Sequence, residues 1–167
     1  NMSENIPALT SFTEDEQAFR EAIRSFAEGE IKPIVGKMDE QAHYQEGLVQ
    51  QLFEMGLMGI EVPEEFGGAG ASFTMACIAV DEISRVDGAV GVMVDVQNTL
   101  VANAFLKHCT PAQKEKYLPQ LATQKVGAYA LSESSSGSDA FALKLRAEEK
   151  DDQLCTKRPQ ALDYKRR

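Results

Sequence analysis

Apolar residues recur at helical spacing through the first two thirds of the chain. The first such stretch follows Thr13 and carries apolar side chains at positions 19, 23, 26 and 27, the period of one buried helical face. Thr13 and Glu16 stand at the spacing of a capping box, so we expect the helix to begin there. Gly29 and Pro33 weaken and interrupt the pattern, because proline lacks the amide hydrogen that continues a helix.

The same period, together with end signals, predicts further helices. Their expected spans are 45–55, 72–86, 90–107 and a short helix from Thr110 to about Pro119. Ser72 and Thr110 are good capping residues, and Pro111 suits the first turn of a helix. The segment 56–70 is rich in Gly and Pro and is expected to form a structured turn. Four or five helices with short connections indicate a helical bundle.

The periodicity changes towards the carboxyl end. Residues 126–133 form a short apolar run and residues 141–146 alternate loosely, so two strands are predicted around a serine-rich loop. An isolated hairpin is marginal in water, so these strands would form only the start of an incomplete β segment. We therefore expect a mainly α chain: a helical domain over residues 1–122, the start of a β domain over 123–150, and a divergent, disordered tail over 151–167.

Composition and charge narrow the classes of function. Apolar residues make up 43% of the chain and charged residues 26%, which is typical of a globular protein. The formal charge of −9 disfavours a nucleic-acid partner, because phosphate binding needs a Lys/Arg surface. No stretch approaches the roughly 18 uninterrupted apolar residues of a membrane span, so none is expected.

The cysteines and histidines do not suggest a metal site. Cys77, Cys109 and Cys155 are odd in number and widely separated, which indicates reduced thiols. His108 and Cys109 are neighbours, but successive side chains on a helix point about 100° apart, so the pair is poorly placed to share a ligand. Neither a metal ligand set nor a catalytic residue is predicted.

The segment 129–142 has the strongest chemical pattern, with the sequence Y-A-L-S-E-S-S-S-G-S-D-A-F-A. An apolar run followed by several hydroxyls and a glycine can present amides and hydroxyls to an anionic or carbonyl-bearing ligand. A solvated turn is the alternative interpretation, because serine-rich loops are common.

Four runs, taken together, resemble the acyl-CoA dehydrogenase family. Residues 130–142 resemble the first signature of that family, and residues 56–70 are similar to its earlier Pro/Gly turn. Residues 12–27 and 111–122 also match the family, in the same order. The resemblance is greatest to the short-chain and short branched-chain members.

The resemblance implies an enzyme of three parts, in which FAD lies between a middle β domain and a carboxy-terminal helical bundle. Such enzymes remove two hydrogens from an acyl-CoA thioester across its α and β carbons. By resemblance, Tyr129, Leu131 and Ser132 would contact the flavin ring. Gly137 and Ser138 would lie in the loop that contacts flavin and CoA, and Ser138 would meet the CoA portion of the substrate.

The resemblance also implies that the fourth helix lines the acyl-chain pocket. Val92, Met93, Val96 and Leu100 would then form its wall. The alternative interpretation is that they are core residues at helical spacing.

After Glu149 the sequence departs from the family, because the expected W-I-[ST]-N strand is absent and the chain has no tryptophan. The glutamate base and the oligomer-forming bundle of the family also lie outside this sequence. We therefore expect a truncated dehydrogenase, inactive alone, from the cytoplasm or the mitochondrial matrix. A non-catalytic helical binding or assembly module is the main alternative, and a tail produced by a frameshift or an engineered end is a third.

Overall fold

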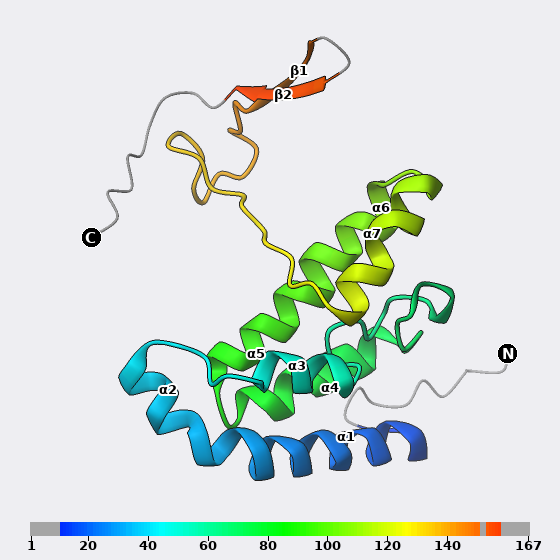
Figure 1. Cartoon of the computed structure of the whole chain (residues 1–167), viewed down its shortest axis with the longest axis vertical. Helices are drawn as coiled ribbons and strands as arrows, with labels where there is room; N and C mark the ends of the chain where they lie inside the picture. The colour runs from blue at the N-terminus through cyan, green and yellow to red at the C-terminus, as the bar shows by residue number, and fades with distance from the viewer. Residues whose placement is uncertain (1–10, 151–152, 158–167) are drawn as a thin grey trace, which may run out of the picture. The chain divides into compact units, whose positions relative to one another are not determined.

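The helical part of the chain forms a unit of its own. The computed structural model describes residues 11–150 and 153–157 (Figure 1). They belong to two compact units, of which the first ends at residue 128 and the second begins at residue 129. The first unit contains, in chain order, α1 (Glu14–Phe26), η1 (Ala27–Ile31), η2 (Lys32–Ile34), α2 (Val35–Gln41), α3 (Leu48–Glu54), η3 (Glu64–Phe66), α4 (Phe73–Ser84), α5 (Gly88–Asp95), η4 (Val96–Ala102), α6 (Asn103–His108) and α7 (Pro111–Thr123). The predicted mainly α fold class is confirmed.

The first helix begins as predicted but continues further. The Thr13 hydroxyl accepts the amide hydrogen of Glu16 at 3.2 Å, and the Glu16 carboxylate accepts that of Thr13 at 2.9 Å. The chain then remains helical past Gly29 and Pro33, through the π-helical η1 and the 3-10 turn η2 into α2. The predicted interruption is thus only a change of winding, because buried Ile31 holds this turn against the core.

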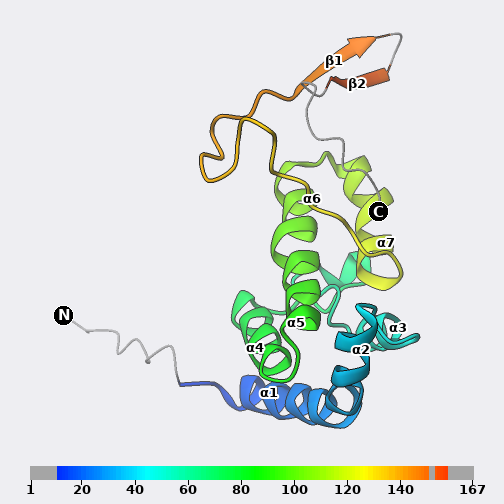
Figure 2. The same ribbon diagram turned by 90° about the vertical axis from the view of Figure 1, so that its left-hand side faces the viewer.

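The core lies where α4 packs against α1 and α5 (Figure 2). Its largest fully buried apolar side chains are Ile23, Ile31, Leu48, Leu52, Leu57, Met58, Ile60 and Ile83. Burying each contributes roughly 1.5–3 kcal/mol. Short helices are marginal in water by themselves, so this burial, more than helix propensity, holds the unit together.

The segment 56–70 forms turns, as predicted. Its short 3-10 helix η3 ends at Gly67, which has a φ of 80° and closes the turn in the left-handed region that favours glycine. Gly68 is required by close approach, because a Cβ there would lie 2.0 Å from the Val62 carbonyl oxygen. The glycines therefore serve turn geometry.

A continuous helix of 21 residues, from Gly88 to His108, combines α5, η4 and α6. It is apolar and long enough to cross a membrane by length and composition, which the sequence analysis did not anticipate. Its inward side chains, Val90, Val94, Val101 and Ala102, are buried within the helical unit. Packing in the core therefore accounts for the apolar character of this inward face.

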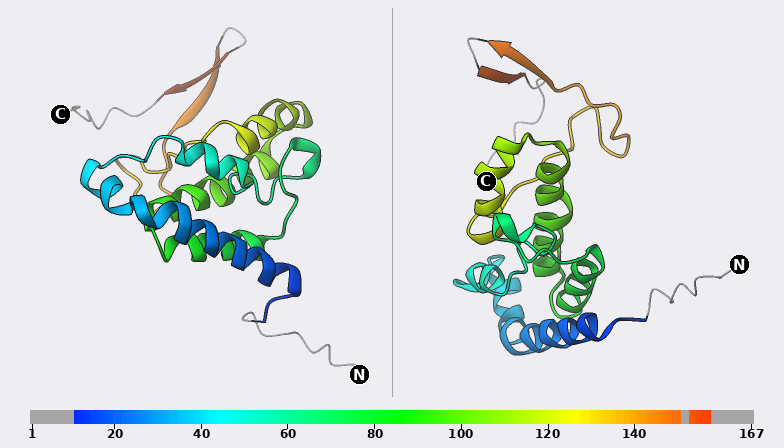
Figure 3. Two further views of the ribbon diagram at one scale, coloured as in Figure 1. Left: turned by 60° about the horizontal axis from the view of Figure 1, so that its bottom comes forward. Right: turned by 90° about the vertical axis from the view of Figure 1, so that its right-hand side faces the viewer.

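Helix α7 packs beside α6 (Figure 3). Thr110 caps the helix and Pro111 occupies its first turn, as predicted. Gln113 completes a capping box with Thr110, which was not predicted. The predicted end near Pro119 is wrong, because the helix runs on to Thr123. Leu118 and Ala122 are buried in a smaller cluster with Val62 and Ala102, and this packing holds the last turn despite the proline.

The strands of the second unit lie later in the sequence than predicted. Residues 126–133 and 141–145 form no strand; β1 (Arg146–Lys150) pairs antiparallel with β2 (Gln153–Lys157), with Arg146 opposite Lys157 and Glu148 opposite Cys155. A strand needs a hydrogen-bonding neighbour, and an apolar run alone does not provide one. Of the predicted disordered tail, residues 153–157 form β2, and residues 151–152 and 158–167 lie outside the described part of the chain.

Candidate functional site

One face of the helix Gly88–His108, called the central helix from here on, exposes apolar side chains. Val92 is 59% exposed and Leu100 is 37% exposed, and Val96 between them is half-buried. Met93 is also half-buried and packs against the main core, while Val94 is fully buried. The structure thus places three of the four predicted acyl-wall residues at every fourth position of one helix, with Met93 beside them. Their role in an acyl pocket stays a prediction.

Two buried amide side chains lie in the middle of this helix. Gln97 and Asn98 are each 1% exposed, so their polar atoms need partners inside the protein. They belong to η4, where the winding is π-helical, a feature frequent at functional sites. The Val94 carbonyl accepts a hydrogen bond from Asn98 Nδ2 at 2.8 Å, which gives that carbonyl a side-chain partner.

Asn98 joins the central helix to the turn after α3. Its Nδ2 donates to the Leu57 carbonyl at 2.8 Å, and its Oδ1 accepts from the Ile60 amide at 2.8 Å. Both partners are buried, so the bonds lie in the core. Asn98 therefore holds the turn segment against the helix.

Gln97 joins the same helix to the end of α7. Its Nε2 donates to the carbonyls of Leu121 at 2.7 Å and Lys125 at 3.0 Å, and its Oε1 accepts from the Gly127 amide at 2.8 Å. Sequence reasoning missed both amides. The signal that could have found them is an adjacent Gln and Asn within an otherwise apolar helix, since buried polar side chains need specific partners.

The predicted cofactor-binding residues lie in the second unit. Tyr129 is 48% exposed and Leu131 is 42% exposed, and Ser132, Gly137 and Ser138 are exposed as well. A Cβ added at Gly137 would meet nothing within 4 Å, so the loop surface is open there. The predicted roles of these residues stay predictions.

A hydrogen-bonded turn closes this loop. The backbones of Glu133 and Ser136 exchange two hydrogen bonds, of 2.9 and 3.1 Å, and buried Ser136 donates from Oγ to the Asp139 carbonyl at 2.7 Å. The Glu133 carboxylate accepts the amide hydrogens of Lys144 at 2.8 Å and Leu145 at 3.0 Å. Glu133 therefore shapes the loop, a role that sequence reasoning missed because its partners lie more than ten positions away.

The loop fits the group that the resemblance implies. Exposed hydroxyls of Ser132 and Ser138 and the open backbone at Gly137 can donate to ring carbonyls and nitrogens. Tyr129 and Leu131 add exposed apolar surface next to them in sequence. A few polar donors beside an apolar surface make the usual lining of a cofactor site, so these residues could hold a flavin.

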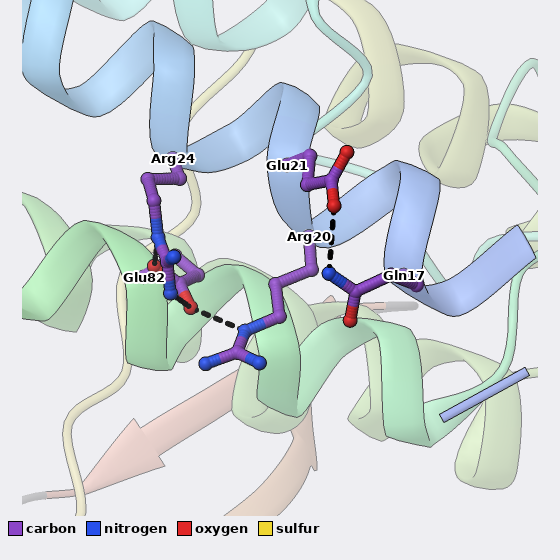
Figure 4. Close-up of polar contacts among 5 residues, drawn as sticks. All are labelled: Gln17, Arg20, Glu21, Arg24 and Glu82. Carbon is purple, nitrogen blue, oxygen red and sulfur yellow. Dashed lines mark hydrogen bonds and ion pairs between the residues drawn. The ribbon is translucent and has the colours of Figure 1, made fainter. Parts of the chain in front are cut away.

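A buried carboxylate joins α1 to α4 (Figure 4). Arg24 donates to both carboxylate oxygens of Glu82, from Nε at 2.8 Å and from Nη2 at 2.8 Å, and Arg20 Nε donates at 2.6 Å. The hydrogen bond from Arg24, supported by Arg20, outweighs burial and lowers the pKa of Glu82 to about 2. A carboxyl group with that pKa stays ionised near neutral pH, and its hydrogen bonds to Arg20 and Arg24 give it a structural role between α1 and α4.

Two hollows in the helical unit lie apart from the predicted residues. A hollow of about 320 Å³ adjoins the 56–70 turn, and another of about 360 Å³ adjoins His43 and Tyr44; neither is lined by a predicted site residue. Across residues 11–150 and 153–157, no group of three His, Cys, Asp or Glu side chains could hold a metal ion. Cys77 and Cys109 are free thiols.

Comparison with known proteins agrees with the helical architecture. Residues 13–125 match the family described as Acyl-CoA dehydrogenase, N-terminal domain. A probable short/branched chain specific acyl-CoA dehydrogenase of Dictyostelium discoideum is 46% identical over 142 residues, which cover 85% of this chain and 34% of that protein. The mitochondrial short/branched chain specific acyl-CoA dehydrogenase of Bos taurus is 42% identical over 144 residues, covering 86% of this chain and 33% of that protein.

The fold has a counterpart among solved structures. Butyryl-CoA dehydrogenase from Megasphaera elsdenii aligns with a TM-score of 0.78 at 30% identity, over 85% of this chain and 38% of that one. The chain spans about a third of the length of the curated relatives it matches.

Proposed function

Because the chain belongs to the acyl-CoA dehydrogenase family, we propose that it contributes the amino-terminal part of a site that oxidises short acyl-CoA thioesters with FAD. The observation that carries the proposal is the exposed apolar strip on the central helix of a domain matched to this family. By analogy with the Bos taurus relative, which is named as mitochondrial, the compartment would be the mitochondrial matrix, or the cytoplasm in a bacterium.

The acyl chain would lie against Val92, Val96 and Leu100. Exposed apolar side chains on a soluble domain are stabilised when a hydrophobic ligand removes them from water. The strip presents no charged side chain at these three positions, so it favours an aliphatic acyl group over a polar one. Its role is to hold the thioester in place and to exclude water from the reacting carbons.

The segment 129–138 would supply contacts to the cofactor and to the CoA portion. Tyr129, Leu131 and Ser132 would lie against the flavin ring, and the Ser138 hydroxyl would bind the CoA portion of the thioester. When bound, FAD supplies the acceptor for the hydride that leaves the β carbon. Glu133 keeps the loop closed through the amides of Lys144 and Leu145.

None of the residues proposed for the site is a catalytic base. Glu133 is engaged by two backbone amides, and Glu82 is held by two guanidinium groups. Removal of the α proton needs a positioned carboxylate. We therefore propose that the 167-residue polypeptide is inactive by itself.

A visible absorption spectrum of the purified chain with added FAD tests whether the chain is inactive by itself. The expected result is a protein without stoichiometric flavin absorbance, and without bleaching on addition of a short acyl-CoA. A yellow protein that is bleached by the thioester would contradict it.

A hybrid protein tests the proposed contribution. Residues 13–142 of this chain would replace the matching segment of the Dictyostelium discoideum relative. We expect the hybrid to bind FAD and to be reduced by a short acyl-CoA. Leu100→Arg in the hybrid should raise KM for the thioester by about tenfold or more with FAD retained, whereas Phe73→Arg, at another exposed apolar position, should not.

A non-catalytic binding or assembly module remains the second candidate. The observation in its favour is that the helical unit has a core of its own. On this alternative, the hybrid would be helical but colourless, and Leu100→Arg would weaken association with another protein instead of changing KM.

A further inference from the structure

Gln97 forms hydrogen bonds to the backbone of Leu121, Lys125 and Gly127, which lie just before the predicted flavin-contact segment in the sequence. We propose that Gln97 is a positioning residue: it fixes on the central helix the backbone of residues 121–127, which lead directly in sequence into the predicted flavin-contact segment. The inference rests on the proposed function, because it assigns a supporting role to a residue outside the predicted contacts. Gln97 itself touches neither substrate nor flavin in this proposal.

The end of α7 is only partly completed by its own residues: the Gln120 carbonyl accepts the amide hydrogens of Gln124 and Lys125, and the Pro119 carbonyl accepts from Thr123 Oγ1. The last carbonyls of a helix have no intrahelical donor, and Gln124, which follows α7, has a φ of −155° and leaves the helical path. Gln97 Nε2 supplies donors for the carbonyls of Leu121 and Lys125. This side chain thus adds partners from the central helix to those that the helix end has of its own.

Burial contributes little to holding the segment that follows. Gln124, Lys125, Val126 and Ala128 are all exposed, and only Gly127 among residues 124–128 is half-buried. With so little apolar surface removed from water, the hydrophobic contribution is small. The hydrogen bonds of Gln97 to Lys125 and Gly127, made by a buried side chain whose unpaired amide would be costly, therefore tie this segment to the central helix.

The backbone at Gly127 also approaches the helix closely. A Cβ at this position would lie 2.3 Å from Val101 Cγ1, and valine has little freedom to turn away. Glycine is needed here for space. The contact and the hydrogen bond to Gln97 lie on successive turns of one helix, and they locate the same stretch of chain.

Gln97 lies among the predicted acyl-wall residues in the sequence, and it binds a residue close to the first predicted flavin contact. It follows Val96 directly and lies three positions before Leu100, both predicted acyl-wall residues. The residue it holds, Gly127, comes two positions before Tyr129, the first predicted flavin contact. A change at Gln97 should therefore disturb cofactor contacts without removing any of the residues that make them.

Asn98 provides a matched control. It is the next residue, equally buried, and also makes three hydrogen bonds to backbone groups, but its partners are Leu57, Ile60 and Val94. Losing either amide should cost similar global stability. Only the loss of Gln97 should release the segment at Gly127.

Hydrogen exchange in the full 167-residue chain is the first test. In Gln97→Met, the Gly127 amide should exchange about tenfold faster or more, as expected when a hydrogen bond is lost. In Asn98→Leu, it should stay within about twofold of the parent, relative to global unfolding. Unchanged protection of Gly127 in Gln97→Met would overturn the proposal.

The hybrid protein with residues 13–142 provides the second test. Gln97→Met should weaken FAD binding about tenfold at an unchanged far-UV spectrum, Asn98→Leu should not, and Gly127→Ala should behave as Gln97→Met because it displaces the same segment. Equal loss of FAD in Gln97→Met and Asn98→Leu would overturn the positioning role. A parent hybrid without FAD would instead contradict the proposed function, and the exchange test would still decide whether Gln97 fixes Gly127.

Discussion

Glu82 shows how a single side chain ties two helices together. Its carboxylate is almost completely buried, yet two guanidinium groups from α1 keep it ionised. A buried charge without partners is expensive, so each arginine matters more here than on the surface. The triad also fixes the register of α1 on α4, because Arg20 and Arg24 lie one helical turn apart.

Replacing Glu82 should change both stability and its dependence on pH. The pKa of Glu82 falls from an ordinary 4.5 to about 2 on folding, so its contribution is fully present above about pH 4.5 and is lost as the pH falls towards 2. Glu82→Gln should lower the free energy of unfolding by roughly 1.5–3 kcal/mol at pH 7. The free energy of unfolding of this variant should also decline less steeply than that of the parent as the pH falls from about 4.5 to about 2. Urea unfolding at several pH values measures both effects.

The control is Glu28→Gln, which removes the exposed pair with Lys32. A surface ion pair contributes less than about 1 kcal/mol. The free energy of unfolding of this variant should therefore depend on pH as it does in the parent protein. A parent-like pH profile in Glu82→Gln would contradict the role assigned to Glu82.

Two glycines should respond in opposite directions to alanine. At Gly68 an added Cβ would meet the Val62 carbonyl at 2.0 Å, so Gly68→Ala should destabilise by about 1–3 kcal/mol or more. At Gly36, inside α2, nothing lies within 4 Å, so Gly36→Ala should stabilise by about 0.5–1 kcal/mol. Thermal midpoints of the two variants test this, and a shift of the same sign in both would refute it.

At the scale of elements, the starts of four helices follow local rules more closely than helix interiors do. Thr13, Ser72, Asp87 and Thr110 each accept an amide hydrogen three residues ahead. The interiors depart from ideal winding at η1 and η4, where buried side chains take precedence over the regular ladder.

The capping box of α7 offers a prediction at this scale. Thr110→Ala should lower stability by about 0.5–2 kcal/mol, because the Gln113 amide loses its partner at the helix start. Thr123→Ala, at the exposed end of the same helix, should stay within about 0.5 kcal/mol of the parent. Chemical denaturation distinguishes them; equal effects at both positions would show that the cap contributes nothing.

At the scale of the whole molecule, the division at residue 128 predicts independent folding of the helical unit. Both hydrophobic clusters lie within residues 11–128. A polypeptide of these residues should be helical and unfold cooperatively, with a midpoint within a few degrees of the 167-residue chain, since a domain with its own core can fold alone. Circular dichroism during heating measures this unfolding transition. A broad signal change without a flat folded baseline would contradict independent, cooperative folding of the helical unit.

The sequence alone predicted much of this molecule wherever neighbouring residues decide the outcome. The helix caps at Thr13, Ser72 and Thr110, the Gly/Pro turn and the mainly α fold class follow from contacts three or four positions apart, which the order of residues already contains. The family resemblance was also visible in short runs. The cofactor and acyl-chain roles of individual residues stay predictions.

Tertiary structure decided the rest, because the deciding partners are distant in sequence. Residues 126–133 have strand-like composition, but strand formation depends on a neighbour, and the structure pairs residues 146–150 with 153–157 instead. Helix α7 passes Pro119 because its last turn packs against Val62 and Ala102. Gln97 reaches the backbone of Gly127, 30 positions away. Such contacts depend on how the chain is folded in space, so only the tertiary structure could assign them.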